Sequence, residues 1–210
     1  MAVVAKEGIP HISIPSILAV VLFLLGYPVG GAVAGAVAVA VALFFRDPGR
    51  TDSAAEGDVL SPADGRIVAV DRVEENRHLG DEALRISVFM SVFNVHVNRI
   101  PMDARVVTVK HVSGGFAMAH LDAAGVINER TEILLLDGSG MKSLMVQVAG
   151  LVARRIICRL REGDDVVRGN RFGLICFGSR VDLYLPAHAQ PLVEIGARVR
   201  AGQSVLAQMR

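Results

Sequence analysis

The segment Glu162-Gly-Asp-Asp-Val-Val-Arg-Gly-Asn170 decides the fold, because its pattern returns once more near the C-terminus. Its counterpart is Glu194-Ile-Gly-Ala-Arg-Val-Arg-Ala-Gly-Gln203, and both segments contain the spacing Gly-x-x-Val-x-x-Gly. Glycines at both ends of a short run are typical of tight corners between short strands, and the valine between them fills a small core. The sequence therefore predicts a β domain that uses the same strand-and-corner unit twice.

The chain after Arg46 has one sequence pattern throughout. Short apolar runs alternate with Gly, Pro and Asp, while helical periodicity is scarce. The predicted class is mainly β, for a domain of residues 46–210. The repeated unit resembles the barrel-sandwich domains of lipoyl and biotinyl carriers, and that resemblance concerns the fold more than the function.

An apolar segment precedes this domain. The stretch from Ile12 to Phe45 contains no charged side chain, and Gly26-Tyr-Pro-Val-Gly-Gly31 interrupts it. A secretory signal would be a single short apolar run, whereas a second apolar helix follows here. We therefore expect residues 1–45 to form a hydrophobic helical hairpin that dips into one leaflet or spans a locally thinned bilayer. The alternative is a buried hairpin in a soluble protein.

Basic residues flank the apolar segment on both sides. Lys6 lies before it, and Arg46 and Arg50 lie after it. Positive flanking charge favours the cytoplasmic side for both ends of the hairpin. The expected location is the cell membrane, with the β domain on its cytoplasmic face.

Composition narrows the function classes. The 210-residue chain has a formal net charge of +1, 5% aromatic residues and no Trp, so nothing indicates a groove for nucleic acid. Cys158 and Cys176 lie in apolar runs without C-x-x-C or Cys/His spacing. They predict buried thiols in a reducing compartment, and neither a disulfide framework nor a metal site.

The dipeptide Gly178-Ser179 lies inside Arg171-Phe-Gly-Leu-Ile-Cys-Phe-Gly-Ser-Arg-Val-Asp-Leu-Tyr-Leu-Pro186, between two strand-like runs. A glycine before a serine lets the backbone distort until the serine oxygen reaches the preceding carbonyl, which permits a chain to cut itself. One alternative is an ordinary hairpin turn between the two strands. Another is a serine hydrolase, but the elbow motif Gly-x-Ser-x-Gly is absent.

Three segments together resemble the short-form, pyruvoyl-dependent phosphatidylserine decarboxylase proenzymes. The segments are Ser61-Pro-Ala-Asp-Gly-Arg-Ile67, Phe89-Met-Ser-Val-Phe-Asn-Val-His-Val-Asn-Arg-Ile-Pro101 and Phe177-Gly-Ser-Arg180. They occur in the family's order and at plausible spacing behind an apolar N-terminus. The resemblance covers nearly the whole chain, from about Phe45 to the C-terminus.

This resemblance implies self-cleavage. The Ser179 hydroxyl would attack the Gly178 carbonyl, convert the peptide bond to an ester and leave a pyruvoyl group in place of the serine. The products would be a β chain of residues 1–178 and an α chain of residues 179–210.

The resemblance also implies the cofactor, the reaction and the partners. The pyruvoyl group derived from Ser179 would form a Schiff base with phosphatidylserine and release carbon dioxide and phosphatidylethanolamine, without a metal or an external cofactor. The implied partners are the phospholipid, the membrane, and the paired β and α chains of one proenzyme. A higher homo-oligomer stays open.

His96 is the candidate base for self-cleavage and the candidate acid for decarboxylation. A serine hydroxyl needs a base within hydrogen-bond reach, and strand alternation puts His96 on one face with Asn94 and Asn98. The alternative is a structural strand histidine. Arg99 stands where many relatives carry a second histidine, and arginine cannot act as a base. Whether His96 serves both steps therefore stays open.

Asp64 has two interpretations. Asp-Gly is a common turn pair, which favours a structural role. The resemblance implies instead that Asp64 orients His96 in an Asp–His–Ser relay. The cations available for a headgroup phosphate, among which the sequence does not choose, are Arg99, Lys110, His111, Arg154, Arg155 and Arg180.

Two further functions compete with the decarboxylase. One is a membrane-anchored lipoyl- or biotinyl-like carrier that is modified at Lys142, although Ser143 replaces the methionine expected after the lysine. The other is a noncatalytic protein that cleaves itself at Gly178. Asn128-Glu-Arg130 resembles another family segment, and the sequence assigns it no role beyond a turn into a strand.

Overall fold

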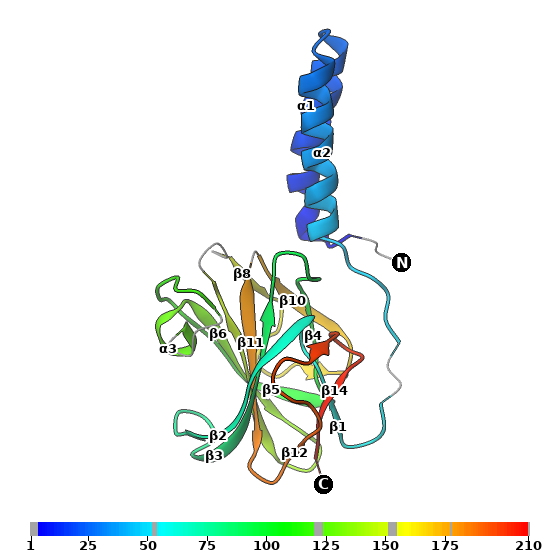
Figure 1. Ribbon diagram of the computed structural model, residues 1–210. Helices are drawn as coiled ribbons and strands as arrows, with labels where there is room; N and C mark the ends of the chain where they lie inside the picture. The colour runs from blue at the N-terminus through cyan, green and yellow to red at the C-terminus, as the bar shows by residue number, and fades with distance from the viewer. Residues whose placement is uncertain (1–3, 52–53, 120–123, 151–154, 177, 210) are drawn as a thin grey trace. The chain divides into compact units, whose positions relative to one another are not determined.

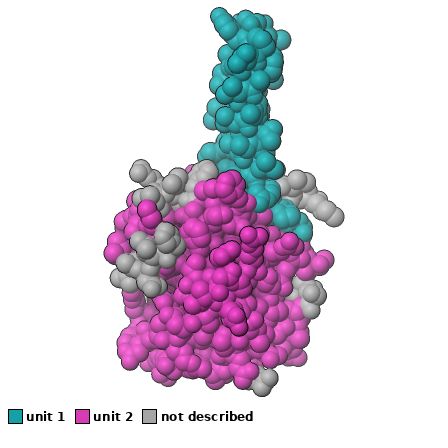
Figure 2. Space-filling view, in the orientation of Figure 1, with its two compact units in different colours: residues 1–49 teal, residues 50–210 magenta. Residues whose placement is uncertain are grey.

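The structure is a computed structural model that describes residues 4–51, 54–119, 124–150, 155–176 and 178–209. The chain divides into two compact units, residues 1–49 and residues 50–210, which Figure 2 colours separately. The first unit is helical, and the second is built almost entirely of strands (Figure 1).

The first unit is a pair of helices. They are α1 (Ile9–Leu24) and α2 (Pro28–Phe44), with a short 3-10 turn (Lys6–Gly8) before α1. Each α-helix has a proline in its first turn, where the backbone amide has no partner within the helix in any case. The chain turns between the helices inside the interruption that the sequence predicts.

Small residues on α2 let the two helices approach closely. A side chain at Gly31 would overlap the Phe23 ring of α1, and Ala34 and Ala38 on the same face are buried. Large apolar side chains point outward instead, and Leu24 is 81% exposed. The pair therefore has a packed inner seam and an apolar outer surface.

One helix in the described part of the chain meets the length and composition needed to cross a membrane. It is the 19-residue stretch Lys6–Leu24, which includes the 3-10 turn, while Pro28–Phe44 is apolar but shorter. An apolar helix near the N-terminus is consistent with membrane association.

The second unit contains the strands and one short helix. In chain order they are β1 (Asp58–Leu60), β2 (Gly65–Glu75), β3 (Asp81–Met90), β4 (Val97–Arg99), β5 (Ala104–Val112), α3 (Ala124–Ile127), β6 (Arg130–Leu136), β7 (Lys142–Val148), β8 (Ile156–Cys158), β9 (Asp165–Val166), β10 (Arg171–Ile175), β11 (Ser179–Pro186), β12 (Gln190–Pro191), β13 (Arg198–Val199) and β14 (Val205–Gln208). The predicted mainly β class is confirmed.

An eight-stranded curled sheet forms the body, in the order β13-β2-β3-β11-β7-β6-β5-β9. Two three-stranded sheets, β1-β14-β12 and β4-β10-β8, accompany it. Alternate residues of β3 enter the core, as the period of a strand requires, and Ile86, Val88 and Met90 are fully buried. Strand β11 lies inside the large sheet, between β3 and β7.

The two copies of the glycine–valine unit form the two edges of the large sheet. Val166 of β9 is paired with Ala104 of β5, and Val199 of β13 is paired with Gly65 of β2. Val199 belongs to the core, and Val166 packs against it. The repeated pattern in the sequence thus corresponds to equivalent edge strands.

The strands on either side of Gly178 belong to different sheets. Strand β10 pairs with β4 and β8, while β11 pairs with β3 and β7. The alternative of a hairpin turn at Gly178-Ser179 is therefore wrong. The dipeptide lies instead where the chain crosses from a small sheet into the large one.

Candidate active site

Gly178 and Ser179 lie where the chain crosses between two sheets, and Gly178 is only partly buried. Gly178 has φ +67°, in the left-handed region that favours glycine. Ser179 is fully buried, and its Oγ has no hydrogen-bond partner in the part of the chain that the structure describes. A buried hydroxyl without a partner costs about 1–3 kcal/mol, so its retention calls for a functional reason.

The turn that carries His96 is attached to both sides of this crossing. Ser179 is opposite Met90, the last residue of β3. On the other side, the Ile175 amide at the end of β10 donates to the His96 carbonyl at 3.3 Å. His96 is 1% exposed. The turn that carries the predicted histidine therefore follows the strand opposite the predicted serine and is bonded to the strand that precedes it.

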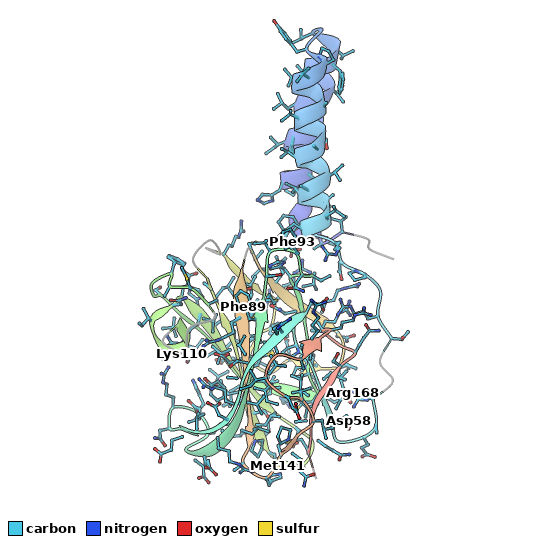
Figure 3. All side chains as sticks on the ribbon, in the orientation of Figure 1. Asp58, Phe89, Phe93, Lys110, Met141 and Arg168 are labelled. Carbon is cyan, nitrogen blue, oxygen red and sulfur yellow. The ribbon has the colours of Figure 1, made fainter. Side chains whose placement is uncertain are left out.

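The His96 turn marks one end of the β unit. Phe93 at its tip is 83% exposed. Figure 3 shows Phe93 at the opposite end of this unit from Met141, which lies in the turn between β6 and β7. The candidate site is therefore close to the surface of the unit even though its reacting groups are buried.

A backbone carbonyl orients the imidazole. His96 Nδ1 is 2.9 Å from the Asn94 carbonyl oxygen, which can only accept, so Nδ1 carries the hydrogen of the neutral ring. Nε2 then presents its lone pair. The Asn94 side chain holds the turn in shape, because its Oδ1 accepts from the Ser91 amide at 2.9 Å and from the Ser91 hydroxyl at 2.7 Å. A neutral His96 can therefore accept a proton at Nε2.

Asp64 contacts Arg50 and Ala201. Its two oxygens accept from the Arg50 guanidinium at 2.5 and 2.7 Å, and Oδ1 also accepts from the Ala201 amide at 2.8 Å. The Asp64–His96 hydrogen bond of the predicted relay is not among the contacts of the described residues. In this structure the Asn94 carbonyl holds the imidazole, and a catalytic role for Asp64 stays a prediction.

The backbone of Gly150 packs closely against the Gly178 carbonyl, and we call Gly150 the wall of the site. A Cβ atom at position 150 would overlap the Gly178 carbonyl oxygen, so only glycine allows the two backbones to approach this closely. Gly150 is itself buried. The sequence analysis did not identify this residue, because a single glycine after a strand carries no distinctive signal.

Asn128 holds the residue before that wall. It is fully buried, and its Nδ2 donates to the Ala149 carbonyl at 2.7 Å and to the Ala117 carbonyl at 2.8 Å. Its Oδ1 accepts from the Ala117 amide at 2.8 Å. The family-like segment Asn128-Glu-Arg130, which had no predicted role, therefore clamps two loops beside Gly178.

A model of the family described as phosphatidylserine decarboxylase matches residues 37–207 of this chain. The chain belongs to the phosphatidylserine decarboxylase family. A phosphatidylserine decarboxylase proenzyme of Pelobacter propionicus is 51% identical over 166 residues, which cover 79% of this chain and 75% of that protein. Proenzymes of Paraburkholderia phymatum and Burkholderia ambifaria are 42% and 44% identical over 99% of this chain and 97% and 96% of their own length.

Membership of the phosphatidylserine decarboxylase family makes the chain an enzyme and excludes the carrier alternative. Lys142, the residue that a carrier would modify, lies in β7 with its side chain exposed. The buried Ser143 beside it packs into the large sheet. Lys142 and Ser143 are therefore the first residues of an ordinary strand.

Two of the arginines considered for a headgroup phosphate have structural partners. Arg99 is 6% exposed and donates to the Gly169 carbonyl at 2.9 Å. Arg180 is 1% exposed and forms an ion pair with Asp182, with nitrogen–oxygen distances of 2.8 and 2.9 Å. Lys110, His111 and Arg155 are exposed, and Arg154 lies outside the described residues.

A pocket of about 590 Å³ adjoins the His96 turn, and three arginines that the sequence analysis overlooked line it. Its lining residues are Asp64, Gly65, Arg66, Phe89, Ser91, Asn94, Arg198, Val199 and Arg200. The alternation Arg198-Val-Arg200 could have signalled two arginines on one face of a strand. Their approach to Arg66 depends on long-range strand pairing and has no local signal.

Within the described ranges, no three His, Cys, Asp or Glu side chains lie close enough together to hold a metal ion. Cys158 and Cys176 are free thiols of intermediate exposure, so the prediction that both are buried is wrong. Burial raises the pKa of Cys158, which lowers its reactivity at neutral pH.

Proposed function

We propose that this chain is a pyruvoyl-dependent decarboxylase that cleaves itself between Gly178 and Ser179 and then converts phosphatidylserine to phosphatidylethanolamine and carbon dioxide. Family membership supports the reaction. The observation that carries the self-cleavage is the buried Ser179 hydroxyl, which follows a left-handed glycine and has no hydrogen-bond partner in the described part of the chain.

Self-cleavage begins at the Ser179 hydroxyl. His96 takes the hydroxyl proton at Nε2, and Oγ attacks the Gly178 carbonyl carbon. The peptide C–N bond breaks, the Ser179 nitrogen gains a proton, and an ester joins the two residues. In the elimination that follows, residue 179 loses its Cα proton to solvent and its Cβ–Oγ bond breaks, which leaves Gly178 with a carboxylate. The resulting dehydroalanine takes up water and loses ammonia, which leaves a pyruvoyl group on the second chain.

The residues around Ser179 fit such a group. Pairing of β11 with β3 and β7 anchors the new chain next to the cut, so its first residue stays beside the His96 turn. A pyruvoyl group supplies an electrophilic carbonyl for the substrate amine and accepts the electrons released when carbon dioxide leaves. We assign to His96 the return of a proton to the substrate α carbon, since its Nε2 can hold one.

The apolar helices give the enzyme access to a substrate that stays in the bilayer. Tethering to the membrane raises the effective concentration of enzyme and lipid at the same surface. With Lys6 before the helices and Arg46 after them, both ends are proposed to lie on the cytoplasmic side of the cell membrane. The mature enzyme would be a heterodimer of residues 1–178 and 179–210.

Three variants test the proposal by intact mass and by product formation from phosphatidylserine. The wild type yields two chains and product, and S179A stays a single chain without activity. H96A loses turnover by about 10²–10⁴-fold, the usual contribution of a positioned acid or base. S139A, at an exposed serine, is the control and behaves as the wild type. Undiminished decarboxylation by H96A or by an uncut S179A chain would overturn the assignment.

A further inference from the structure

The pocket beside the His96 turn carries an excess of positive charge that the fold itself does not need. We propose that Arg66, Arg198 and Arg200 bind the phosphate of the lipid headgroup in this pocket. The inference rests on the proposed function and adds where the substrate phosphate lies.

The pocket adjoins the turn that orients His96. Two of its lining residues, Ser91 and Asn94, form the turn whose carbonyl orients His96. A third, Phe89, directly precedes the residue of β3 that is opposite Ser179. Arg66 is opposite Phe89 in the register, one row of the sheet away from the Met90–Ser179 pair.

The three arginines have no acidic partner within the described residues. Arg66, Arg198 and Arg200 are all exposed to solvent, and no ion pair joins any of them to a described carboxylate. Asp64 is the single acid of the lining, and Arg50 already binds both of its oxygens. The pocket thus presents uncompensated guanidinium groups, whose planar N–H donors suit phosphate oxygens.

Two of these arginines face each other directly. Arg66 of β2 and Arg198 of β13 are opposite in the antiparallel register, so their side chains leave the same face of the sheet. Arg200 follows two residues later and lines the same pocket. Like charges directly opposite on neighbouring strands are destabilising. An anion between them removes the repulsion.

The β5–β9 edge of the large sheet repeats the backbone arrangement of the β2–β13 edge, so the residues at the two edges can be compared. Asp103 accepts from the Arg168 amide at 2.7 Å, just as Asp64 accepts from the Ala201 amide at 2.8 Å. The residues that follow are Gly65-Arg66 in one copy and Ala104-Arg105 in the other.

At the equivalent position the second copy has opposite charges. Arg105 of β5 is paired with Asp165 of β9, where the first copy pairs Arg66 with Arg198. The fold therefore accepts an Arg–Asp pair at this position. The Arg–Arg pair occurs only in the copy that adjoins the His96 turn, as expected for a residue choice made for a ligand.

The first experiment measures binding by calorimetric titration of the mature, full-length enzyme. The probes are glycerophosphoethanolamine, which carries the phosphodiester but no carboxylate to lose, and inorganic phosphate. R198Q, R66Q and R200Q should each weaken glycerophosphoethanolamine binding by about tenfold, the effect of one charge-assisted hydrogen bond. R105Q is the matched control and should keep wild-type affinity.

The second experiment separates binding from chemistry and from folding. With phosphatidylserine as substrate, R198Q should raise KM about tenfold and leave kcat nearly unchanged. Its melting temperature should rise by about 1–3 °C, because the repulsion from Arg66 is relieved. R105Q, which removes an arginine that is opposite an aspartate in the register, should show no such rise.

The outcomes are distinct from a failure of the proposed function. Intact mass and decarboxylation of the wild type test that function, while probe binding tests the pocket. Equal affinity of R198Q and the wild type for glycerophosphoethanolamine would overturn the proposal. Binding of inorganic phosphate alone would also overturn it, since the ligand would then be free phosphate and not a lipid headgroup.

Discussion

Gly150 has no side chain, and this leaves room for the carbonyl of the bond that we propose is cut. The Gly178 carbonyl carbon is the atom that Ser179 must attack, and its oxygen lies where a Cβ of residue 150 would be. Protein interiors cannot absorb such an overlap without moving backbone. The position of the Gly178 carbonyl therefore depends on residue 150 having no Cβ atom.

Gly150→Ala should slow self-cleavage by at least about tenfold, because even a carbonyl displaced by less than 1 Å loses its alignment with the attacking oxygen. Intact mass at intervals after synthesis measures the uncut fraction. Gly138→Ala is the control, since nothing lies within 4 Å of a Cβ there. Wild-type processing of the Gly150 variant would show that the wall has no influence on the cut.

At the scale of elements, one buried amide joins the loops that build the wall. Asn128 makes three hydrogen bonds to the backbone of Ala117 and Ala149. Asn128→Ala leaves these buried backbone groups unsatisfied, so we expect a loss of about 2–4 kcal/mol in the free energy of unfolding. Chemical denaturation measures it, with Asn76→Ala at an exposed site as the control. A loss below about 0.5 kcal/mol would contradict the clamp.

Strand β6 carries a second polar cluster that gives the fold a pH dependence. Burial alone would raise the pKa of Glu132, but hydrogen bonds from His78 and Arg130 outweigh it and hold that pKa below its ordinary value of 4.5. A carboxylate with a lowered pKa in the folded state stabilises the fold above pH 4.5, and this contribution disappears as the pH falls through the folded pKa.

E132Q should therefore be less stable than the wild type at pH 7, and the difference should shrink below pH 4.5. Melting temperatures of both proteins between pH 7 and pH 3 test this, with E82Q at an exposed surface pair as the control. A gap that stays constant or widens toward low pH would exclude the ionised carboxylate as its cause.

For the whole molecule, we propose that the outer surface of the helical unit holds the enzyme at the membrane. Its large apolar side chains are exposed, and a soluble protein rarely leaves such a continuous apolar surface uncovered. The full-length chain should sediment with phospholipid vesicles at high salt, because apolar burial is insensitive to ionic screening. Detergent should release it. Recovery in the salt-washed soluble fraction would show that the helices do not enter the bilayer.

Local patterns in the sequence predicted the mainly β class, the glycine corners at the sheet edges and the interruption between the two apolar helices. These are features of neighbouring residues. The partners of side chains were harder to predict. Asp64 pairs with Arg50, and Arg66 faces Arg198, because contacts between distant strands depend on a register that no local pattern encodes. The hairpin alternative at Gly178 failed for the same reason.

The central claim is that the chain cuts itself ahead of residue 179 and that the new end carries the catalytic carbonyl. Intact-mass spectrometry of the purified, active enzyme tests both parts together. The account predicts two chains, one ending at Gly178 and the other beginning with a pyruvoyl group derived from Ser179. A fully active preparation that consists of one unbroken chain would contradict it.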